Sequence, residues 1–376
     1  MANSQPSDTV ELWITTFRGQ IWAVLRTSAG GTHQFSPRPL ADINASNDAM
    51  FVCLDEFSKD VWQWSTTLDP ADRNKHLDDM AAAGRDLATA LFGDELPTFV
   101  GLLSQHHARR LDIVVCDETF SPYWDFVRIV HRGTEIYLGD LVVVTAGYTL
   151  PVDEEPENME EEYPIVRLPR PIGPVGLVED EDLPSSSRNP ATGVAKEIST
   201  LTPIVHHVSN VDVLRPMVTS ARATEIDELN RWLGPQRRVV HFNCHGASAT
   251  RGRNVDPSLN ITTSFSVDKS DLHTCDLSYG LVNLNVCNSA VGTYSSRKTF
   301  CQAFHDQNAE ATICTTGSVD DSFATAFAEV LYERLANEDL LTSMHEARRT
   351  LSRTHQHPMS LMYTFTGPSS FRLDRV

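Results

Sequence analysis

The alternation of hydrophobic and polar positions predicts a β-hairpin at the start of the chain and a helix after it. Glu11–Arg26 alternates apolar and polar residues around a glycine turn, which is typical of two antiparallel strands. Met50–Leu54 is expected as a further short strand. From Pro70 to Phe92 apolar residues recur at helical spacing, and Asp69 is placed to cap that helix. We therefore expect residues 1–68 to form a small β-rich N-terminal element.

Further along the chain, short apolar runs alternate with amphipathic segments. The expected strands are 111–115, 141–145, 175–178, 204–208, 311–317, 362–365 and 371–373, and the expected helices are 194–201, 223–233, 299–307, 323–335 and 340–351. Strands that alternate with helices over residues 110–340 are typical of an α/β domain with a mostly parallel sheet. We expect this domain to occupy residues 69–376.

Two further apolar runs each end in a reactive side chain. Arg238–Gly246 stops at His245, and Leu281–Ser289 stops at Cys287. Such runs, bounded by Gly, Ser and Asn, indicate buried strands of a parallel sheet, where chemistry is found beyond the carboxyl ends of the strands. The sequence therefore predicts a thiol–imidazole pair. The histidine lies 42 positions upstream (287 − 245), close to the roughly 50 that separate the two residues in caspases.

A zinc site is the alternative use of these histidines. His241, Cys244 and His245, with His206 and His207 nearby in sequence, are residue types that bind zinc. On a strand, however, His241 and His245 point to one face and Cys244 to the other. The sequence has no C-x-x-C pair to complete four ligands. We therefore expect no metal and no other cofactor.

Composition and charge narrow the class of protein. The chain has 376 residues, 41% hydrophobic and 22% charged, as in an ordinary soluble globular protein. Its net charge of −19 and the lack of a basic patch argue against nucleic acid as a ligand. No apolar run approaches 18 residues, and the first residues do not form a signal peptide, so neither a membrane span nor secretion is expected.

The cysteines favour a reducing compartment. There are seven, an odd number with irregular spacing, which fits the cytosol better than a disulfide framework. We expect Cys244, Cys301 and Cys314 to be buried thiols. The expected location is therefore cytoplasmic.

Several segments are expected to be loops. Eleven acidic and two basic residues lie between Pro151 and Asp182, so residues 152–163 are interpreted as a flexible acidic loop. A loop that is cleaved on activation is the alternative for this stretch. Residues 179–192 are expected to form a second flexible loop, and the polar insertion at 247–279 a hairpin or loop over the site.

Four segments together resemble a known family. Val240–Gly246 resembles the H-F-x-C-H-G strand end of CHAT domains, which are caspase-like cysteine proteases in the clan of separase, metacaspases and caspases. Leu281–Ala290 resembles their second block, a strand that ends in the nucleophilic cysteine. Pro122–Phe126 is similar to the family's P-W-E element, and Tyr137–Gly139 to the glycine turn that follows it. The resemblance covers residues 70–373.

The resemblance implies a fold and a reaction. The fold would be a caspase-like, mostly parallel sheet flanked by helices, preceded by the small β-rich element. Cys287 would be the nucleophile and His245 the general base, since only the thiolate attacks and a nearby imidazole can remove the thiol proton. By analogy with the clan, the backbone N–H groups of Gly246 and Cys287 would form the oxyanion hole.

Substrate recognition is expected at the same edge of the sheet. Asp320 and Asp321 follow the strand expected at 311–317. In separase-like relatives an acidic pocket accepts Arg or Lys, and this is one interpretation of the pair. A helix N-cap before Phe323 is the other, and one aspartate could serve each purpose. Asn288-Ser289 replaces the acidic–Thr pair that usually follows the nucleophile in the family, which removes no catalytic group.

The expected function follows from this resemblance. We expect a cysteine endopeptidase that cleaves a specific protein partner in a regulated pathway of the antiviral defence or cell-death type, together with an activating partner protein. The alternative is a catalytically inactive CHAT-fold module that serves as an interaction scaffold. The N-terminal element, residues 1–68, is our candidate for docking or regulation.

Overall fold

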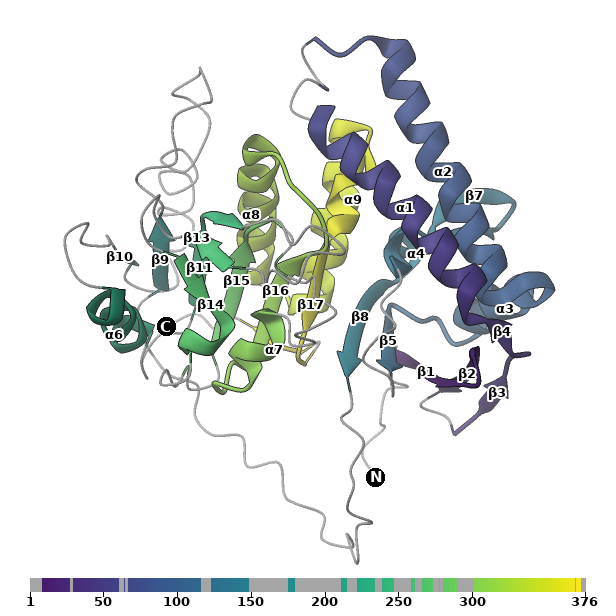
Figure 1. Cartoon of the computed structure of the whole chain (residues 1–376), viewed down its shortest axis with the longest axis horizontal. Coiled ribbons are helices and arrows are strands. Elements are labelled where there is room, and N and C mark those ends of the chain that lie inside the picture. Colours follow the sequence, from purple (N-terminus) through teal and green to yellow (C-terminus); the bar gives the residue numbers. More distant parts are fainter. Residues whose placement is uncertain are drawn as a thin grey trace, which may run out of the picture.

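The chain folds around two six-stranded sheets (Figure 1). The computed structural model describes residues 9–27, 30–60, 64, 67–115, 123–148, 175–179, 211–214, 222–233, 239–246, 258–260, 266–272, 277, 280–287, 289, 300–368 and 370–372. The acidic loop expected at 152–163, the loop expected beyond residue 179, and the helix and strand expected at 194–201 and 204–208 lie outside these residues.

The first sheet is built from the N-terminal hairpin and two later strands. Its order is β3-β2-β1-β5-β8, with β4 also paired to β2. The bounds are β1 (Thr9–Phe17), β2 (Gln20–Thr27), β3 (Thr32–Gln34), β4 (Arg38–Pro39), β5 (Arg110–Val115) and β8 (Val143–Tyr148). The predicted hairpin is confirmed: Arg18 and Gly19, with φ of 51° and 74°, form its two-residue turn. Because β1 runs parallel to β5, this sheet crosses the boundary expected at residue 68.

A long helix occupies the region where a strand was expected. The predicted strand at Met50–Leu54 is wrong, because these residues lie inside α1 (Leu40–Asp60). Ile43, Met50, Leu54 and Phe57 recur at intervals of three, four or seven residues and are all buried. This spacing puts them on one face of a helix, where they pack against the core.

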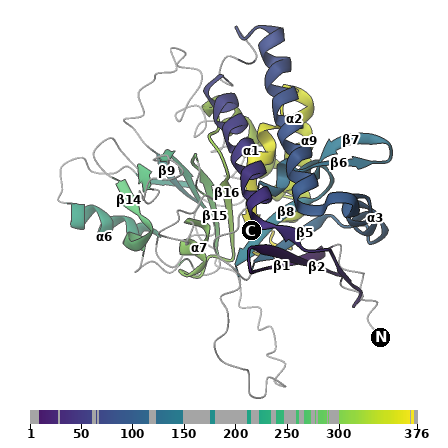
Figure 2. The same cartoon turned by 45° about the vertical axis from the view of Figure 1, so that its right-hand side comes forward.

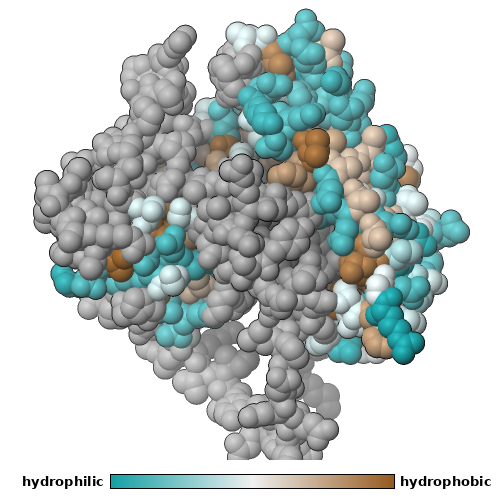
Figure 3. Space-filling view, viewed as in Figure 1, coloured by the Kyte–Doolittle hydropathy of each residue, from teal (hydrophilic) through white to brown (hydrophobic). Residues whose placement is uncertain are grey.

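The second helix is the one that the sequence predicts. α2 spans Pro70–Phe92, and the Asp69 carboxylate accepts the backbone N–H of Ala71 at 2.7 Å. Figures 1 and 2 show α1 and α2 side by side as a helical pair, and α2 leads through a 3-10 turn (Gly93–Glu95) into α3 (Leu96–Gln105). On the face shown in Figure 3, hydrophilic side chains cover much of this pair.

The second sheet holds most of the predicted parallel strands. Its order is β10-β9-β11-β15-β16-β17, and β17 is antiparallel to β16 while the other pairs are parallel. The bounds are β9 (Val175–Glu179), β10 (Val211–Leu214), β11 (Val239–Asn243), β15 (Leu281–Asn285), β16 (Ala311–Thr315) and β17 (Tyr363–Thr366). The expected α/β class with a mostly parallel sheet is confirmed. The strand expected at 371–373 is not formed at residues 371 and 372.

Helices cover both faces of this sheet. On one face lie α6 (Arg222–Leu233) and α7 (Phe300–His305), whose apolar side chains pack with Val240 and Val282. On the other lie α8 (Asp321–Leu335) and α9 (Leu340–His355), which pack with Val239 and Leu281. Neighbouring strand residues therefore point to opposite helical layers, as a pleated strand requires. Between β11 and β15, a small sheet forms from β12 (His245–Gly246), β13 (Ser258–Asn260) and β14 (Ser266–Asp268), followed by a 3-10 turn (Lys269–Leu272).

Two of the cysteines expected to be free thiols are paired. Cys301 of α7 and Cys314 of β16 form a disulfide, so the prediction of free thiols is wrong for both. Their Cα atoms lie 6.6 Å apart, because α7 packs on the face of β16 that carries Cys314. Cys244, by contrast, is a buried thiol, as predicted.

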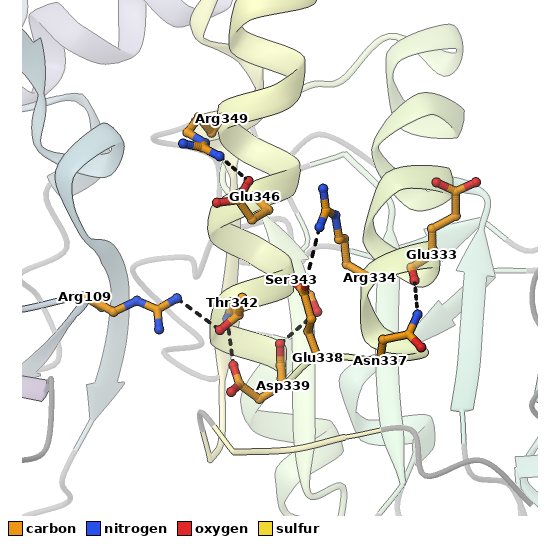
Figure 4. Close-up of polar contacts among 10 residues, drawn as sticks. All are labelled: Arg109, Glu333, Arg334, Asn337, Glu338, Asp339, Thr342, Ser343, Glu346 and Arg349. Carbon is orange, nitrogen blue, oxygen red and sulfur yellow. Dashed lines mark hydrogen bonds and ion pairs between the residues drawn. The ribbon is translucent and has the colours of Figure 1, made fainter. Parts of the chain in front are cut away.

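The two sheets meet edge to edge at β8 and β17. The Thr364 hydroxyl donates to the Val144 carbonyl at 3.0 Å, and Arg109, before β5, donates to the Thr342 hydroxyl of α9 at 3.0 Å (Figure 4). The segment before β8 adds further contacts with the C-terminal half. It comprises a 3-10 turn (Trp124–Phe126), β6 (Arg128–His131), β7 (Thr134–Tyr137) and α4 (Leu138–Leu141).

A buried ion pair crosses this junction. Arg348 of α9 donates to the Asp125 carboxylate at 2.8 Å and to the Tyr363 carbonyl, and the arginine side chain is 2% exposed. Burial raises the pKa of Asp125 to about 6, against the opposing effect of the Arg348 charge. The Arg348 guanidinium favours the ionised carboxylate, so the two groups are buried as a pair.

Among the described residues, no helix has the length and apolar composition needed to cross a bilayer. Large hydrophobic side chains that are exposed, Phe17, Val52 and Val130, lie on three different elements, β1, α1 and β6. Within the described part of the chain these three therefore do not form one apolar patch on a single element.

We predict that Arg348→Leu lowers the free energy of unfolding by about 3–5 kcal/mol, since it leaves the Asp125 carboxylate buried without its partner. Arg349→Leu is the matched control, because Arg349 is half exposed and pairs with Glu346 on the surface (Figure 4). That substitution should cost at most about 1 kcal/mol. Urea unfolding measures both, and similar losses for the two variants would contradict a special role for the buried pair.

A second prediction concerns His357, which lies among the rings of Phe57, Trp64 and Phe323. Burial, and then the neighbouring His355, lower the pKa of His357 to about 3. The unfolded chain takes up this proton near pH 6.5, so the neutral imidazole stabilises the fold above that pH. The contribution is lost as the pH falls from 6.5 towards 3.

Between pH 7 and pH 5 this histidine should therefore account for about 2 kcal/mol of lost stability. His357→Asn keeps an acceptor for the Met359 N–H, which His357 Nδ1 receives at 3.3 Å, but it cannot be charged. In urea titrations at both pH values, the variant should lose about 2 kcal/mol less than the wild type. Equal losses would show that His357 is not the group responsible.

Candidate active site

The register of two neighbouring strands sets the frame of the site. β11 and β15 are parallel, and Asn243 is paired with Asn285 at their carboxyl ends. His245 and Cys287 each follow two residues after this last pair, beyond the ends of the two strands. The backbone of His245 continues into β12, where it pairs with Asn260. The side chain of His245 and the surroundings of Gly246 lie outside the described part of the structure.

Cys287 is half-buried, and its thiol lies against the loop that follows β16. The Val319 N–H donates to Cys287 Sγ at 3.4 Å, and Sγ lies 3.7 Å from the Val319 carbonyl oxygen. The thiol thus has both a backbone donor and a backbone acceptor of Val319 beside it, a contact that sequence reasoning did not identify.

The turn after Cys287 is tied to the next strand. Ser289 is buried, and its hydroxyl accepts the Thr315 N–H at 2.9 Å. The Thr315 hydroxyl in turn donates to the Val286 carbonyl. These bonds fix the turn on both sides of Cys287. Ser289, which departs from the usual family residue, thus has a structural role here.

Asp320 is the N-cap of α8. Its carboxylate accepts the backbone N–H groups of Ser322 and Phe323 at 3.0 and 3.2 Å, so the capping interpretation holds for this residue. The carboxylate also raises the pKa of His355, although burial, the larger effect, lowers it. The side chain of Asp321 lies outside the described part of the structure.

The N-terminal half also reaches this loop. The Ser58 hydroxyl, near the end of α1, lies 2.7 Å from the Leu54 carbonyl and 3.3 Å from the Ser318 carbonyl. On the other side of the loop, Thr316 donates its N–H to the Met362 carbonyl at 2.8 Å. The segment that contacts the Cys287 thiol is therefore held from both halves of the chain.

Polar side chains lie below the site on the face of the sheet that packs against α8 and α9. His241 and Asn283, on adjacent strands, both contact the Tyr332 hydroxyl, and the Tyr363 hydroxyl donates to Asn285 Oδ1 at 2.6 Å. All five side chains are buried. The sequence contained a signal for them, since asparagine at every second position is unusual in a strand as apolar as β15.

The zinc alternative receives no support from these positions. His241 Nδ1 lies 3.0 Å from the Tyr332 hydroxyl, while Cys244 lies in the apolar cluster on the opposite face. His206 and His207 lie outside the described residues. In the part of the chain that the structure describes, no group of three or more His, Cys, Asp or Glu side chains is placed to hold a metal ion.

Known structures share this fold. Two structures of the separase–securin complex from Saccharomyces cerevisiae are similar to the chain, with TM-scores of 0.54 and 0.51 and identities of 9% and 8%. Each similarity covers 96% of this chain and 30% of the other, so the chain spans about a third of that protein. Gingipain RgpB from Porphyromonas gingivalis has a TM-score of 0.46 at 11% identity, covering 82% of this chain and 79% of the other. The two separase structures therefore share the fold of this chain.

The family model gives the narrower assignment. The model of the CHAT domain matches residues 135–364, which is more than half of the chain. The chain therefore belongs to the CHAT domain family. A search among curated proteins found no match.

We predict that iodoacetamide labels Cys287 first at pH 6. Burial, and then Asp79 and Glu56, raise the pKa of the half-buried Cys53, and Cys244 is fully buried. The rate at Cys287 should exceed that at either of them on the order of tenfold, as expected for a thiol with thiolate character. Mass spectrometry resolves the labelled residues. Uniform slow labelling would instead favour an inert scaffold.

Proposed function

We propose that the chain is a cysteine endopeptidase in which Cys287 is the nucleophile and His245 the general base. The observation that supports the proposal is the in-register pairing of β11 and β15, the two strands after which His245 and Cys287 follow along the chain. Chemistry at the carboxyl ends of parallel strands is the general pattern of such sheets. Membership of the CHAT family and the separase-like fold support the same reaction.

The proposed reaction uses two proton transfers in each of its two halves. His245 removes the thiol proton of Cys287, and the thiolate attacks the carbonyl carbon of the scissile peptide bond. The negative charge on the carbonyl oxygen is stabilised by the backbone N–H groups of Gly246 and Cys287. When the C–N bond breaks, the imidazolium gives its proton to the leaving amine. Water, activated by the same imidazole, then hydrolyses the thioester and restores the thiol.

We further propose that the substrate is a specific protein partner, with Arg or Lys before the cleaved bond. Asp320 and Asp321 start α8, directly after the loop that contacts Cys287, and a basic side chain would meet their charge there. The separase in the similar structures is bound to a protein, securin, which supports a protein partner. An activating partner and a defence or cell-death pathway are proposals that come from the family resemblance, and the cytoplasmic location is a proposal that comes from the number and spacing of the cysteines.

Peptidase activity is tested by comparing the wild type with Cys287→Ala on a peptide library and on proteins encoded beside its gene. We expect cleavage by the wild type and a loss of at least about 10³-fold in the variant, the scale seen when a catalytic nucleophile is removed. Cys53→Ala is the matched control and should keep full activity, since Cys53 is a thiol on α1 that has no part in the proposed reaction. If both cysteine variants cleave equally, Cys287 is not the nucleophile.

Asparagine substitutions distinguish two roles of Asp320 and Asp321: binding a basic substrate side chain and capping α8. Asparagine caps a helix about as well as aspartate, so Asp320→Asn should leave stability nearly unchanged while it removes the charge. We expect Asp321→Asn to lower kcat/KM for Arg and Lys substrates by 10-fold or more, on the order of a lost charged hydrogen bond. Asp320→Asn should have a smaller effect, because its carboxylate already accepts two N–H groups. Unchanged preference in both variants would exclude this acidic pocket.

A further inference from the structure

Tyr332 of α8 contacts both strands that carry the proposed catalytic residues. Its hydroxyl lies 3.0 Å from Nδ1 of His241 on β11 and accepts from Nδ2 of Asn283 on β15 at 3.2 Å. His241 and Asn283 are register partners. His241 lies four residues before His245 (245 − 241), and Asn283 lies four residues before Cys287 (287 − 283). The bridge therefore joins the two strands at the same distance along the chain from each proposed catalytic residue.

One hydrogen bond of this bridge has a defined direction. The amide nitrogen of Asn283 can only donate, so the phenol oxygen accepts from it. With the imidazole proton on Nε2, the phenol donates its own proton to Nδ1 of His241, and this is the arrangement that the proposal uses. A phenol hydroxyl can donate one hydrogen bond and accept another at the same time, whereas a phenylalanine ring can do neither. The hydroxyl therefore links the two strands through side chains, in addition to their backbone hydrogen bonds.

Stability alone does not explain why these groups are polar. Tyr332 is 2% exposed, and His241 and Asn283 are each 1% exposed. Burying polar groups is costly unless they are hydrogen-bonded, and apolar residues of similar shape give comparable stability. Hydrogen bonds among Tyr332, His241 and Asn283 instead fix the geometry, because they form only when β11 and β15 have one particular offset and distance from each other.

We propose that Tyr332 is a positioning residue that sets the placement of His245 relative to Cys287. The inference rests on the proposed function, because it assigns the bridge to the spacing of that pair. A displacement of about 1 Å between reacting groups can lower a rate on the order of 10²-fold. Tyr363, whose hydroxyl donates to Asn285 on the same face of β15, holds the next position towards the nucleophile.

The experiment compares Tyr332→Phe with Tyr137→Phe. Tyr137 is a buried tyrosine of β7, on the other side of the junction between the sheets, and it lies outside the proposed machinery. Three quantities are measured: the free energy of unfolding, kcat and KM on a cleaved peptide, and the pH midpoint of iodoacetamide labelling at Cys287.

We expect Tyr332→Phe to lower kcat by about 10- to 100-fold with KM within about twofold, and to raise the labelling midpoint by about one pH unit. Tyr137→Phe should change neither quantity. If Tyr332→Phe lowers stability but leaves kcat and the labelling midpoint at wild-type values, its role is structural only and the positioning proposal is wrong.

Two substitutions at His241 keep the test decisive if Tyr332→Phe does not fold. His241→Leu removes the acceptor on β11 but leaves the bond between Asn283 and Tyr332. His241→Gln supplies a new acceptor for the same hydroxyl. The proposal requires a fall in kcat for the leucine variant and recovery of at least half of the loss in the glutamine variant. Equal activity of the two variants overturns it.

Failure of the proposed function is distinguishable from failure of this inference. If wild-type Cys287 labels no faster than Cys53 and no peptide is cleaved, the proposed function is wrong, and the positioning role is wrong with it. If the wild type is active and Tyr332→Phe matches it in kcat and in labelling, the positioning proposal alone is overturned.

Discussion

The parallel pairing of β11 with β15 is the constraint on which the site depends. Side chains alternate along a strand, so a slip of one residue would move every residue of β15 to the opposite helical layer. The observed register places Val239 opposite Leu281 and Asn243 opposite Asn285. Apolar residues then fill both layers, and Cys287 emerges beside the loop before α8. The position of the thiol is therefore a consequence of how the core is packed.

The surroundings of Cys287 come from distant parts of the chain. Val319 lies between β16 and α8, Ser58 on α1 touches the preceding residue of that loop, and Met362 holds its beginning. A substrate that binds at this edge would meet a loop already fixed by backbone hydrogen bonds. Pre-organised backbone donors of this kind need little rearrangement during a reaction, which is the main advantage of an enzyme site over water.

The sequence was informative where periodicity was strong. β11, β15, α2 and α8 lie where the apolar spacing indicated, because burial requires such spacing. α1 was missed because the run Met50–Leu54 looks like a strand on its own, whereas Ile43 and Phe57 extend the helical period on both sides. The parallel pairing of β1 with β5 joins segments about a hundred residues apart, and no local pattern encodes it. The disulfide of Cys301 with Cys314 depends on how α7 packs on β16, so it could not be predicted from spacing either.

For the candidate site, sequence patterns indicated the two strand ends but not their supports. Asp320 could be a cap or a pocket residue from its position alone, and the structure shows the cap. Tyr332 gave no signal, because a tyrosine on the buried face of an amphipathic helix is ordinary. Its partners were more conspicuous, since Asn283 and Asn285 interrupt an apolar strand. A regular polar interruption in a buried strand is therefore worth examining before a structure is known.

The buried pair of Asp125 with Arg348 has a consequence for how the protein unfolds. One charge belongs to the segment before β8 and the other to α9, so neither half can lose its structure without leaving a buried charge alone in the other. Partial unfolding of one sheet is thereby penalised, and the two sheets should melt together as a single cooperative unit. A chain that carries two sheets, each large enough to be a domain by itself, would then behave in calorimetry as one.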